Sequence, residues 1–240
     1  MTMNIKTIVT FGGIALLAAG LQSVIAGDIT GKVTLKGTPP PEKINTDIAE
    51  DVNCGKLHSE PVKTQFYVVS PDGGLADTVV MLKGITGKST GASAPPLEID
   101  QKGCEYTPYI SVAQTGQTII VKNSDPVLHN VHTTPTVAGN AEENKAQMPG
   151  GADLKFSFSA PENFIRFKCD VHRWMFCYVT VTDHPYATVS GTDGKFTIKN
   201  VPPGKYTIVA MHRKAAPDGV EKEIEVTADG AKVDFTLEVK

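Results

Sequence analysis

The chain has 240 residues, of which 40% are hydrophobic and 20% are charged, and its formal net charge at pH 7 is −3. This composition is that of a globular protein, and it excludes a wholly disordered chain, a collagen and a coiled coil. It provides no strong positive field, so we expect no nucleic-acid partner. The 22 glycines and 16 prolines indicate many turns and favour an all-β fold.

The N-terminal segment, residues 1–26, is typical of a signal peptide. Its one charged residue is Lys6, and an apolar run over residues 8–19 follows. This run is shorter than the roughly 20 residues that cross a bilayer. Val24 and Ala26 fit the small-residue cleavage pattern, so we expect cleavage after Ala26. The mature protein is then periplasmic or secreted, with no stable membrane span after signal cleavage; an uncleaved anchor is the alternative.

Short alternating runs of apolar and polar residues, separated by Gly, Pro, Asn and Asp, predict β-strands along the rest of the chain. Such runs are typical of an all-β sandwich. Residues 87–96 and 134–151 are Gly/Ser/Pro-rich or polar and are predicted to be loops, although residues 140–147 could hold a short helix. The predicted strands cover residues 29–35, 65–69, 78–82, 109–112, 118–122, 154–158, 164–168, 177–181, 195–198, 205–210, 221–226 and 232–239.

Two short motifs contain side chains that bind transition metals. Cys169, His172 and Met175 form a Cys-x-x-His-x-x-Met motif at the end of an apolar strand, where a tight loop can direct all three toward one point. Upstream, His129 follows a turn-forming Asp-Pro pair and can supply one more ligand. One thiolate, two imidazoles and a weak thioether are the ligand set of a blue-copper electron-transfer site.

Residues 97–183 resemble the cupredoxin family, most closely its plastocyanin, amicyanin and pseudoazurin branch. The resemblance rests on the joint presence of the Cys-x-x-His-x-x-Met motif and of Asn123 six residues before a His-Asn pair. It implies a Greek-key β-sandwich that holds one type 1 copper ion. The implied ligands are three equatorial side chains, His129, Cys169 and His172, and a long axial one, Met175. Asn130 would tie the two ligand loops together by hydrogen bonds.

These residues also permit other interpretations. Cys169 could form a disulfide with Cys177 across a hairpin, and the Cys/His/His set could hold zinc. Met175 could be an ordinary core residue. Trp174, the only Trp in the chain, could shield the copper, form part of a docking surface or be a packed aromatic.

The remaining cysteines and histidines carry weaker signals. With Cys169 assigned to metal, Cys54 and Cys104 remain as a disulfide that joins the N-terminal region to the central domain, which export permits. Cys177 is expected to be a buried, inert thiol. His132 lies three residues from His129, so on an extended strand it points to the opposite face. The sequence leaves open whether three further histidines form a second metal site at the domain junction. These are His132, His184 and His212.

The C-terminal part reads as strand, Asp-Gly turn, strand, Pro-Pro-Gly turn and strand. From about residue 186 to 240 it resembles the carboxypeptidase-regulatory-like, or prealbumin-like, small β-sandwich. That family normally opens with Gly-x-Val-Thr, which occurs here at residues 31–34. The small sandwich is therefore either split, with the central domain inserted into it, or sequential to the central domain.

We expect an all-β molecule made of a Greek-key cupredoxin β-sandwich plus a small prealbumin-like β-sandwich. Residues 27–96 are expected to form an N-terminal β region, which under one interpretation is the first part of a split sandwich. Residues 97–183 are expected to form the cupredoxin domain, and residues 184–240 the small sandwich.

The expected function is that of an exported type 1 (blue) copper protein that transfers single electrons between redox partner proteins, and not that of an enzyme. Electrons are expected to pass through the more solvent-near ligand, His172. The alternative is a copper-binding or copper-delivery protein, or a cell-envelope interaction protein that retains a cupredoxin metal site. Copper nitrite reductases and multicopper oxidases need more copper ligands than the chain clearly supplies, and no His-Glu-x-x-His peptidase motif occurs.

Overall fold

The computed structural model describes residues 25–239, and in this part of the chain nearly all regular structure is β. The exceptions are one α-helix, α1 (Thr46–Glu50), and two short 3-10 helices, η1 (Gly55–Leu57) and η2 (Gly91–Ser93). The all-β prediction is confirmed. The predicted signal peptide lies outside the described residues except for its last two positions.

Among the helices of residues 25–239, none has the length and apolar character needed to cross a membrane.

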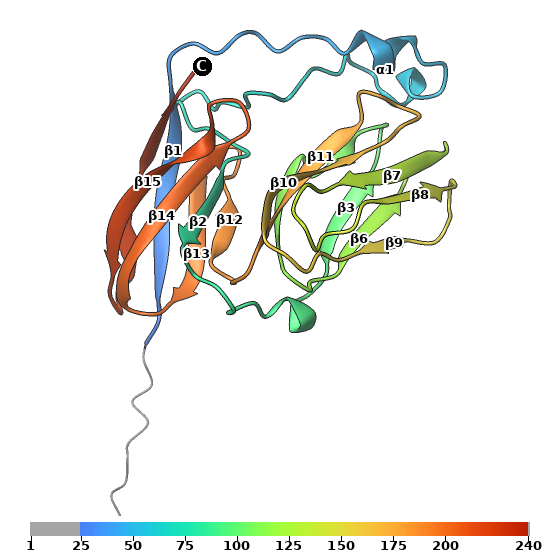
Figure 1. The fold of residues 1–240 in the computed structure, drawn as a ribbon. Helices are drawn as coiled ribbons and strands as arrows, with labels where there is room; N and C mark the ends of the chain where they lie inside the picture. Colours follow the sequence, from blue (N-terminus) through green and yellow to red (C-terminus); the bar gives the residue numbers. More distant parts are fainter. Residues whose placement is uncertain (1–24, 240) are drawn as a thin grey trace, which may run out of the picture.

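One β-sandwich, at the left in Figure 1, combines strands from both ends of the described chain. In its first sheet, β1 (Gly27–Lys36) pairs antiparallel with one strand and parallel with two others. These partners are β13 (Lys195–Val201), β16 (Ala231–Lys232) and β17 (Phe235–Glu238). Its second sheet has the order β12 (Ala187–Val189), β2 (Val79–Lys83), β14 (Gly204–His212) and β15 (Ala216–Val226). The first and last strands of the described chain therefore lie in the same sheet.

A second β-sandwich, at the right in Figure 1, is formed by the central part of the chain. One sheet has the order β5 (Ile110–Gln114), β11 (Phe176–Thr182), β10 (Glu162–Lys168), β7 (His129–Thr134) and β8 (Glu143–Gln147). The other has the order β4 (Tyr106–Thr107), β3 (Leu97–Gln101), β6 (Ile119–Asn123) and β9 (Leu154–Phe156). Phe167 packs edge-on against Phe156 and Phe158 between these sheets, and the three rings are buried. Burial of each ring contributes about 2–3 kcal/mol to folding.

Two local predictions were wrong. Residues 134–151, predicted to be a loop that could hold a short helix over residues 140–147, instead contain β8, which pairs antiparallel with β7. Along β8, Glu143, Lys145 and Gln147 are the less exposed positions, which is the two-residue period of a strand. The predicted strand over residues 65–69 is a loop segment that carries only an isolated bridge between Val69 and Leu75.

Between β1 and β2 the chain leaves the first sandwich, crosses to one end of the second and returns (Figure 1). Helix α1 begins there because the Asn45 side chain accepts a hydrogen bond from the Ile48 backbone N–H, and Ile48 is buried. The predicted disulfide between Cys54 and Cys104 is confirmed. It fixes this crossing segment, residues 37–78, to the second sandwich.

The two sandwiches share a small apolar interface. Val79 on β2 and Val209 and Met211 on β14 pack with Ile110 on β5 and Tyr178 on β11, and all five are buried. The sandwiches are therefore packed against each other as well as joined by the chain.

Candidate metal centre

Three of the predicted ligands meet inside the second sandwich. The Nδ1 atoms of His129 and His172 are 3.0 Å apart, and the Cys169 sulfur lies 3.9 Å and 3.6 Å from them, respectively. These three atoms form a triangle whose centre is about 2 Å from each, close to the length of a transition-metal bond to nitrogen or sulfur. All three residues are buried. The residues present therefore fit one metal ion without a shift of the backbone.

The loop that carries two of these ligands is closed by its own backbone. Strands β10 and β11 pair through Lys168 and Phe176, and the chain between them must turn within seven residues. The Cys169 N–H donates to the carbonyl of Met175, and the Met175 N–H donates to the carbonyl of His172. Met175, the predicted axial ligand, is buried at the end of this loop.

Asn130 connects β7 with the same loop. Its side-chain oxygen accepts a hydrogen bond of 2.8 Å from the Asp170 backbone N–H and lies 3.4 Å from the Cys169 sulfur. Its amide group donates to Oδ2 of Asp170 and to the side-chain oxygen of Asn144. The position of the Cys169 thiol is thus tied to the strand that carries His129.

Asp125 is a candidate functional residue that the sequence did not reveal. Its Oδ2 accepts a hydrogen bond of 2.9 Å from Nε2 of His129 and one of 2.8 Å from the Cys104 N–H. Its Oδ1 accepts a third, of 2.6 Å, from the Gly103 N–H. Since Nε2 of His129 donates its proton to this carboxylate, Nδ1 keeps a lone pair that points at the triangle. In the sequence Asp125 is part of an Asp-Pro turn, and nothing local distinguishes it from a turn residue.

The surroundings favour the ligand form of the cysteine. Burial raises the pKa of the Cys169 thiol, but hydrogen bonds from His129 and from backbone N–H groups together outweigh it and lower that pKa. Burial lowers the pKa of His129, whereas its contacts with Asp125 and Cys169 raise it more. For His172 burial dominates, so its pKa is lowered and the neutral ring is favoured. A thiolate and a neutral imidazole are the forms that bind metal.

The most exposed of the three ligands is covered by the crossing segment. His172 is 6% exposed, against 0% for His129 and 2% for Cys169. One of its ring nitrogens lies within 4.8 Å of both disulfide sulfurs, Cys54 and Cys104. The Trp174 ring is 5.1 Å from the His172 ring, and its Nε1 donates to the carbonyl of Cys104. The disulfide and Trp174 therefore separate His172 from solvent.

Cys177 and three further histidines lie apart from the candidate metal centre. Cys169 and Cys177 are both free thiols, so no disulfide links them, and burial raises the pKa of Cys177. His132 bonds Asp170 and Glu142 near the surface. The buried rings of His184 and His212 accept hydrogen bonds from nearby backbone N–H groups. In the part of the chain that the structure describes, no group of three potential ligands includes any of these three histidines.

Comparisons with known proteins add two observations. A sequence profile of the family described as "BOS complex subunit NOMO1-like, second beta sandwich domain" matches residues 180–240. No curated protein has a significantly similar sequence.

Solved structures resemble the chain only in part. The copper-containing nitrite reductase from Thermus scotoductus SA-01 aligns with a TM-score of 0.33 and 16% identity, over 42% of this chain and 25% of that one. A purple cupredoxin from Nitrosopumilus maritimus has a TM-score of 0.30 and 20% identity, over 36% and 99%. An oxidised amicyanin mutant has a TM-score of 0.32 and 19% identity, over 42% and 97%. The chain thus spans a quarter of the length of the nitrite reductase, and similarity at this level does not assign it to a family.

Proposed function

We propose that the protein is a type 1 copper protein of the cupredoxin kind that carries single electrons between redox partner proteins, and that it is not an enzyme. The observation that carries the proposal is the buried triangle of Cys169, His129 and His172, whose atoms are those of a blue-copper site. When bound there, copper would supply a one-electron Cu(II)/Cu(I) couple. Met175 is the proposed weak axial ligand.

The side chains around the triangle would keep its geometry constant in both oxidation states. Asp125 fixes the orientation of the His129 ring, and Asn130 fixes the loop of Cys169. Because the rings and the thiol are buried, the site excludes water that could otherwise enter as an additional ligand. A preformed, dry site of this kind suits electron transfer, since few atoms need to move when the charge of the metal changes.

The test is the visible spectrum of the Cu(II)-loaded protein. We expect an intense thiolate-to-copper band that is absent from Cys169→Ser and present in Cys177→Ser, a matched change at the other free buried cysteine. Met175→Leu is expected to keep the copper and change the reduction potential, because an axial thioether bond is weak. A colourless copper complex would contradict the proposal. So would a protein that binds zinc and copper with equal affinity and shows no thiolate-to-copper band.

A second candidate function is copper binding or delivery within a cell-envelope interaction protein. The match of residues 180–240 to a β-sandwich domain named after a complex subunit favours it, because a pure electron shuttle needs no attached sandwich. Voltammetry separates the two functions. A fast, reversible one-electron wave supports electron transfer, whereas metal that passes readily to an apo-acceptor without such a wave supports delivery.

The location outside the cytoplasm is also a proposal. The Cys54–Cys104 disulfide supports it, because such bonds persist in oxidising compartments. We expect cell fractionation to find the chain in the periplasm or the medium, with residues 1–26 removed.

A further inference from the structure

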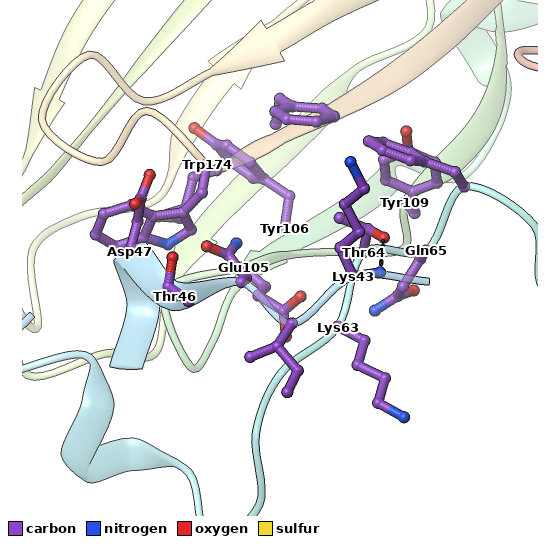
Figure 2. A pocket seen from close by; sticks show the side chains of 15 residues that line it. Lys43, Thr46, Asp47, Lys63, Thr64, Gln65, Glu105, Tyr106, Tyr109 and Trp174 are labelled. Atoms are coloured by element: carbon purple, nitrogen blue, oxygen red, sulfur yellow. Dashed lines mark hydrogen bonds between the residues drawn. The ribbon is translucent and has the colours of Figure 1, made fainter. Parts of the chain in front are cut away.

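A pocket of about 300 Å³ opens between the crossing segment and the second sandwich (Figure 2). Its lining includes Trp174 and Met175, which belong to the loop of the candidate metal centre. Five aromatic side chains contribute to its walls. These are Phe66, Tyr106, Tyr109, Trp174 and Phe176. A pocket of this size and lining is suited to one planar ring, because flat aromatic faces contact each other well.

The polar side chains of the pocket divide it into two ends. Lys43 lies at the end of Tyr109, the Lys63 side chain points away from the aromatic side chains, and Asp47 and Glu105 lie nearer Trp174 (Figure 2). Within residues 25–239, none of these four side chains forms an ion pair or a side-chain hydrogen bond. The charges of Lys43, Asp47 and Glu105 are therefore free to contact a bound molecule. An occupant that satisfies both ends has a negative group near Lys43 and a hydrogen-bond donor near the carboxylates.

The end of the pocket with Asp47 and Glu105 adjoins the candidate metal centre. Trp174 lines the pocket with its half-buried ring, which lies 5.1 Å from the ring of His172. Its Nε1 is held by the Cys104 carbonyl, so the ring has a fixed place between the pocket and His172. A molecule in this pocket would thus contact the side chain that packs on a proposed metal ligand.

We infer that the pocket binds a small hydroxyaromatic anion, such as a phenol or hydroquinone that carries a carboxylate or sulfonate group. The ring lies among the aromatic walls, the anionic group faces Lys43, and the hydroxyl donates to Glu105 or Asp47. The binding of this molecule does not depend on the function proposed for the metal site.

The test uses hydroquinone sulfonate as the probe and the full mature chain without metal. Calorimetry gives the Kd, and the emission of Trp174, the only Trp in the chain, reports the place of binding. We expect the emission to change, and both hydroquinone, which lacks the anion, and benzenesulfonate, which lacks the hydroxyls, to bind more weakly. Lys43→Glu is expected to weaken binding about tenfold, because it reverses an unpaired charge at the site. Lys199→Glu, the same change at an exposed position of β13, is expected to leave the Kd unchanged.

A second variant tests the other end of the pocket. Glu105→Gln should weaken the binding of hydroquinone sulfonate and leave that of benzenesulfonate unchanged. Equal Kd values for the Lys43 and Lys199 variants, no heat or emission change at millimolar probe, or a preference for the cationic phenol tyramine would each overturn the inference. A blue copper protein that fails to bind the probe contradicts the pocket alone, whereas a colourless copper complex that still binds it contradicts the electron-carrier proposal alone.

Discussion

At the scale of single residues, Asp125 joins His129 of the candidate metal centre to the backbone next to the Cys54–Cys104 disulfide. Its carboxylate receives three hydrogen bonds, from Gly103, Cys104 and His129. Burial raises its pKa, but these three donors lower it more, so the carboxylate stays ionised beside the ligand ring. A negative charge that accepts from the far nitrogen of a ligand makes the ring a stronger donor toward a cation.

The variant Asp125→Asn tests this role. The amide keeps one acceptor oxygen but loses the charge, and its NH₂ group must face one of the backbone N–H donors. We expect the affinity for Cu(II) to fall by about 10- to 100-fold, as for other partners of ligand histidines. The affinity for Cu(I) should fall less, so the reduction potential should rise. Chelator competition and voltammetry measure these changes, with exposed Asp153→Asn as the control. A normal potential in Asp125→Asn would show that Asp125 only supports the fold.

His212 is expected to make stability depend on pH. Its ring is buried, its Nδ1 accepts from the Ala215 N–H, and burial lowers its pKa from 6.5 to about 4. Between these two values the unfolded chain binds a proton that the folded chain does not, so the free energy of unfolding falls as the pH falls. The loss between pH 7 and pH 5 is about 2 kcal/mol.

Urea unfolding of the metal-free protein at pH 7 and pH 5 measures this effect. His212→Asn keeps a neutral acceptor but cannot take up the proton, so it should lose about 2 kcal/mol less than the wild type over the same interval. Contributions of other groups cancel in this difference. An identical pH dependence in both proteins would mean that His212 is already protonated, or accessible to water, in the folded state.

The residues of the candidate metal centre differ in how far the sequence reveals them. Cys169, His172 and Met175 lie within one loop, where local spacing predicts a ligand set, and His129 lies in a second short motif. The contact between Asp125 and Cys104, and the place of the disulfide over His172, depend on segments that meet only after folding. No local pattern records such contacts. They are therefore visible only in the structure.

At the scale of elements, the crossing segment lies over His172 of the candidate metal centre, where Cys54 joins Cys104. It has little regular structure of its own, and the Cys54–Cys104 disulfide closes a loop with a sequence separation of 50. A cross-link over a loop of this length stabilises the folded state by about 4 kcal/mol, because it restricts the unfolded chain.

The double variant Cys54→Ser/Cys104→Ser is expected to lose about that free energy of unfolding. With copper bound, its visible band should persist, since Cys169 is untouched. Removal of copper by a chelator should be faster, because His172 loses the sulfurs that lie over it. Stopped-flow measurement of the band gives the rate, with Cys177→Ser as the control. Equal rates in the double variant and the control would contradict a covering role.

Elements with a clear two-residue period could be predicted, whereas those shaped by tertiary contacts could not. β10 alternates between more and less buried residues, whereas β11 is a continuous run of mainly β-branched and aromatic residues that is buried along nearly its whole length. β8 lies in a polar stretch and forms because Gln147 bonds Gln101 and a backbone carbonyl inside the sandwich. The stretch over residues 65–69 is apolar enough for a strand, yet it packs as a loop beside the pocket.

At the scale of the whole molecule, the two sandwiches are one packed body. Besides the apolar interface, Arg213 follows β14 in the first sandwich and stacks 3.8 Å from the Tyr178 ring centre on β11 of the second. Its guanidinium also donates a hydrogen bond of 2.8 Å to the Tyr178 hydroxyl. The sequence left open whether the small sandwich is split or sequential, because its Gly-x-Val-Thr segment lies far from residues 184–240 along the chain. The pairing of β1 with β13 and β17 is a long-range contact of the kind that periodicity does not encode.

Arg213→Ala tests whether this interface makes unfolding cooperative. We expect the wild type to unfold in one calorimetric transition, because exposure of Val79, Ile110 and Met211 would destabilise each sandwich alone. The variant should lose about 1–2 kcal/mol, the value of a partly desolvated cation–π contact. Lys205→Ala, an exposed change on the same strand as the interface, should leave the transition unchanged. Two separate transitions in the wild type would show that the sandwiches unfold independently and that the Arg213 contact does not couple their unfolding.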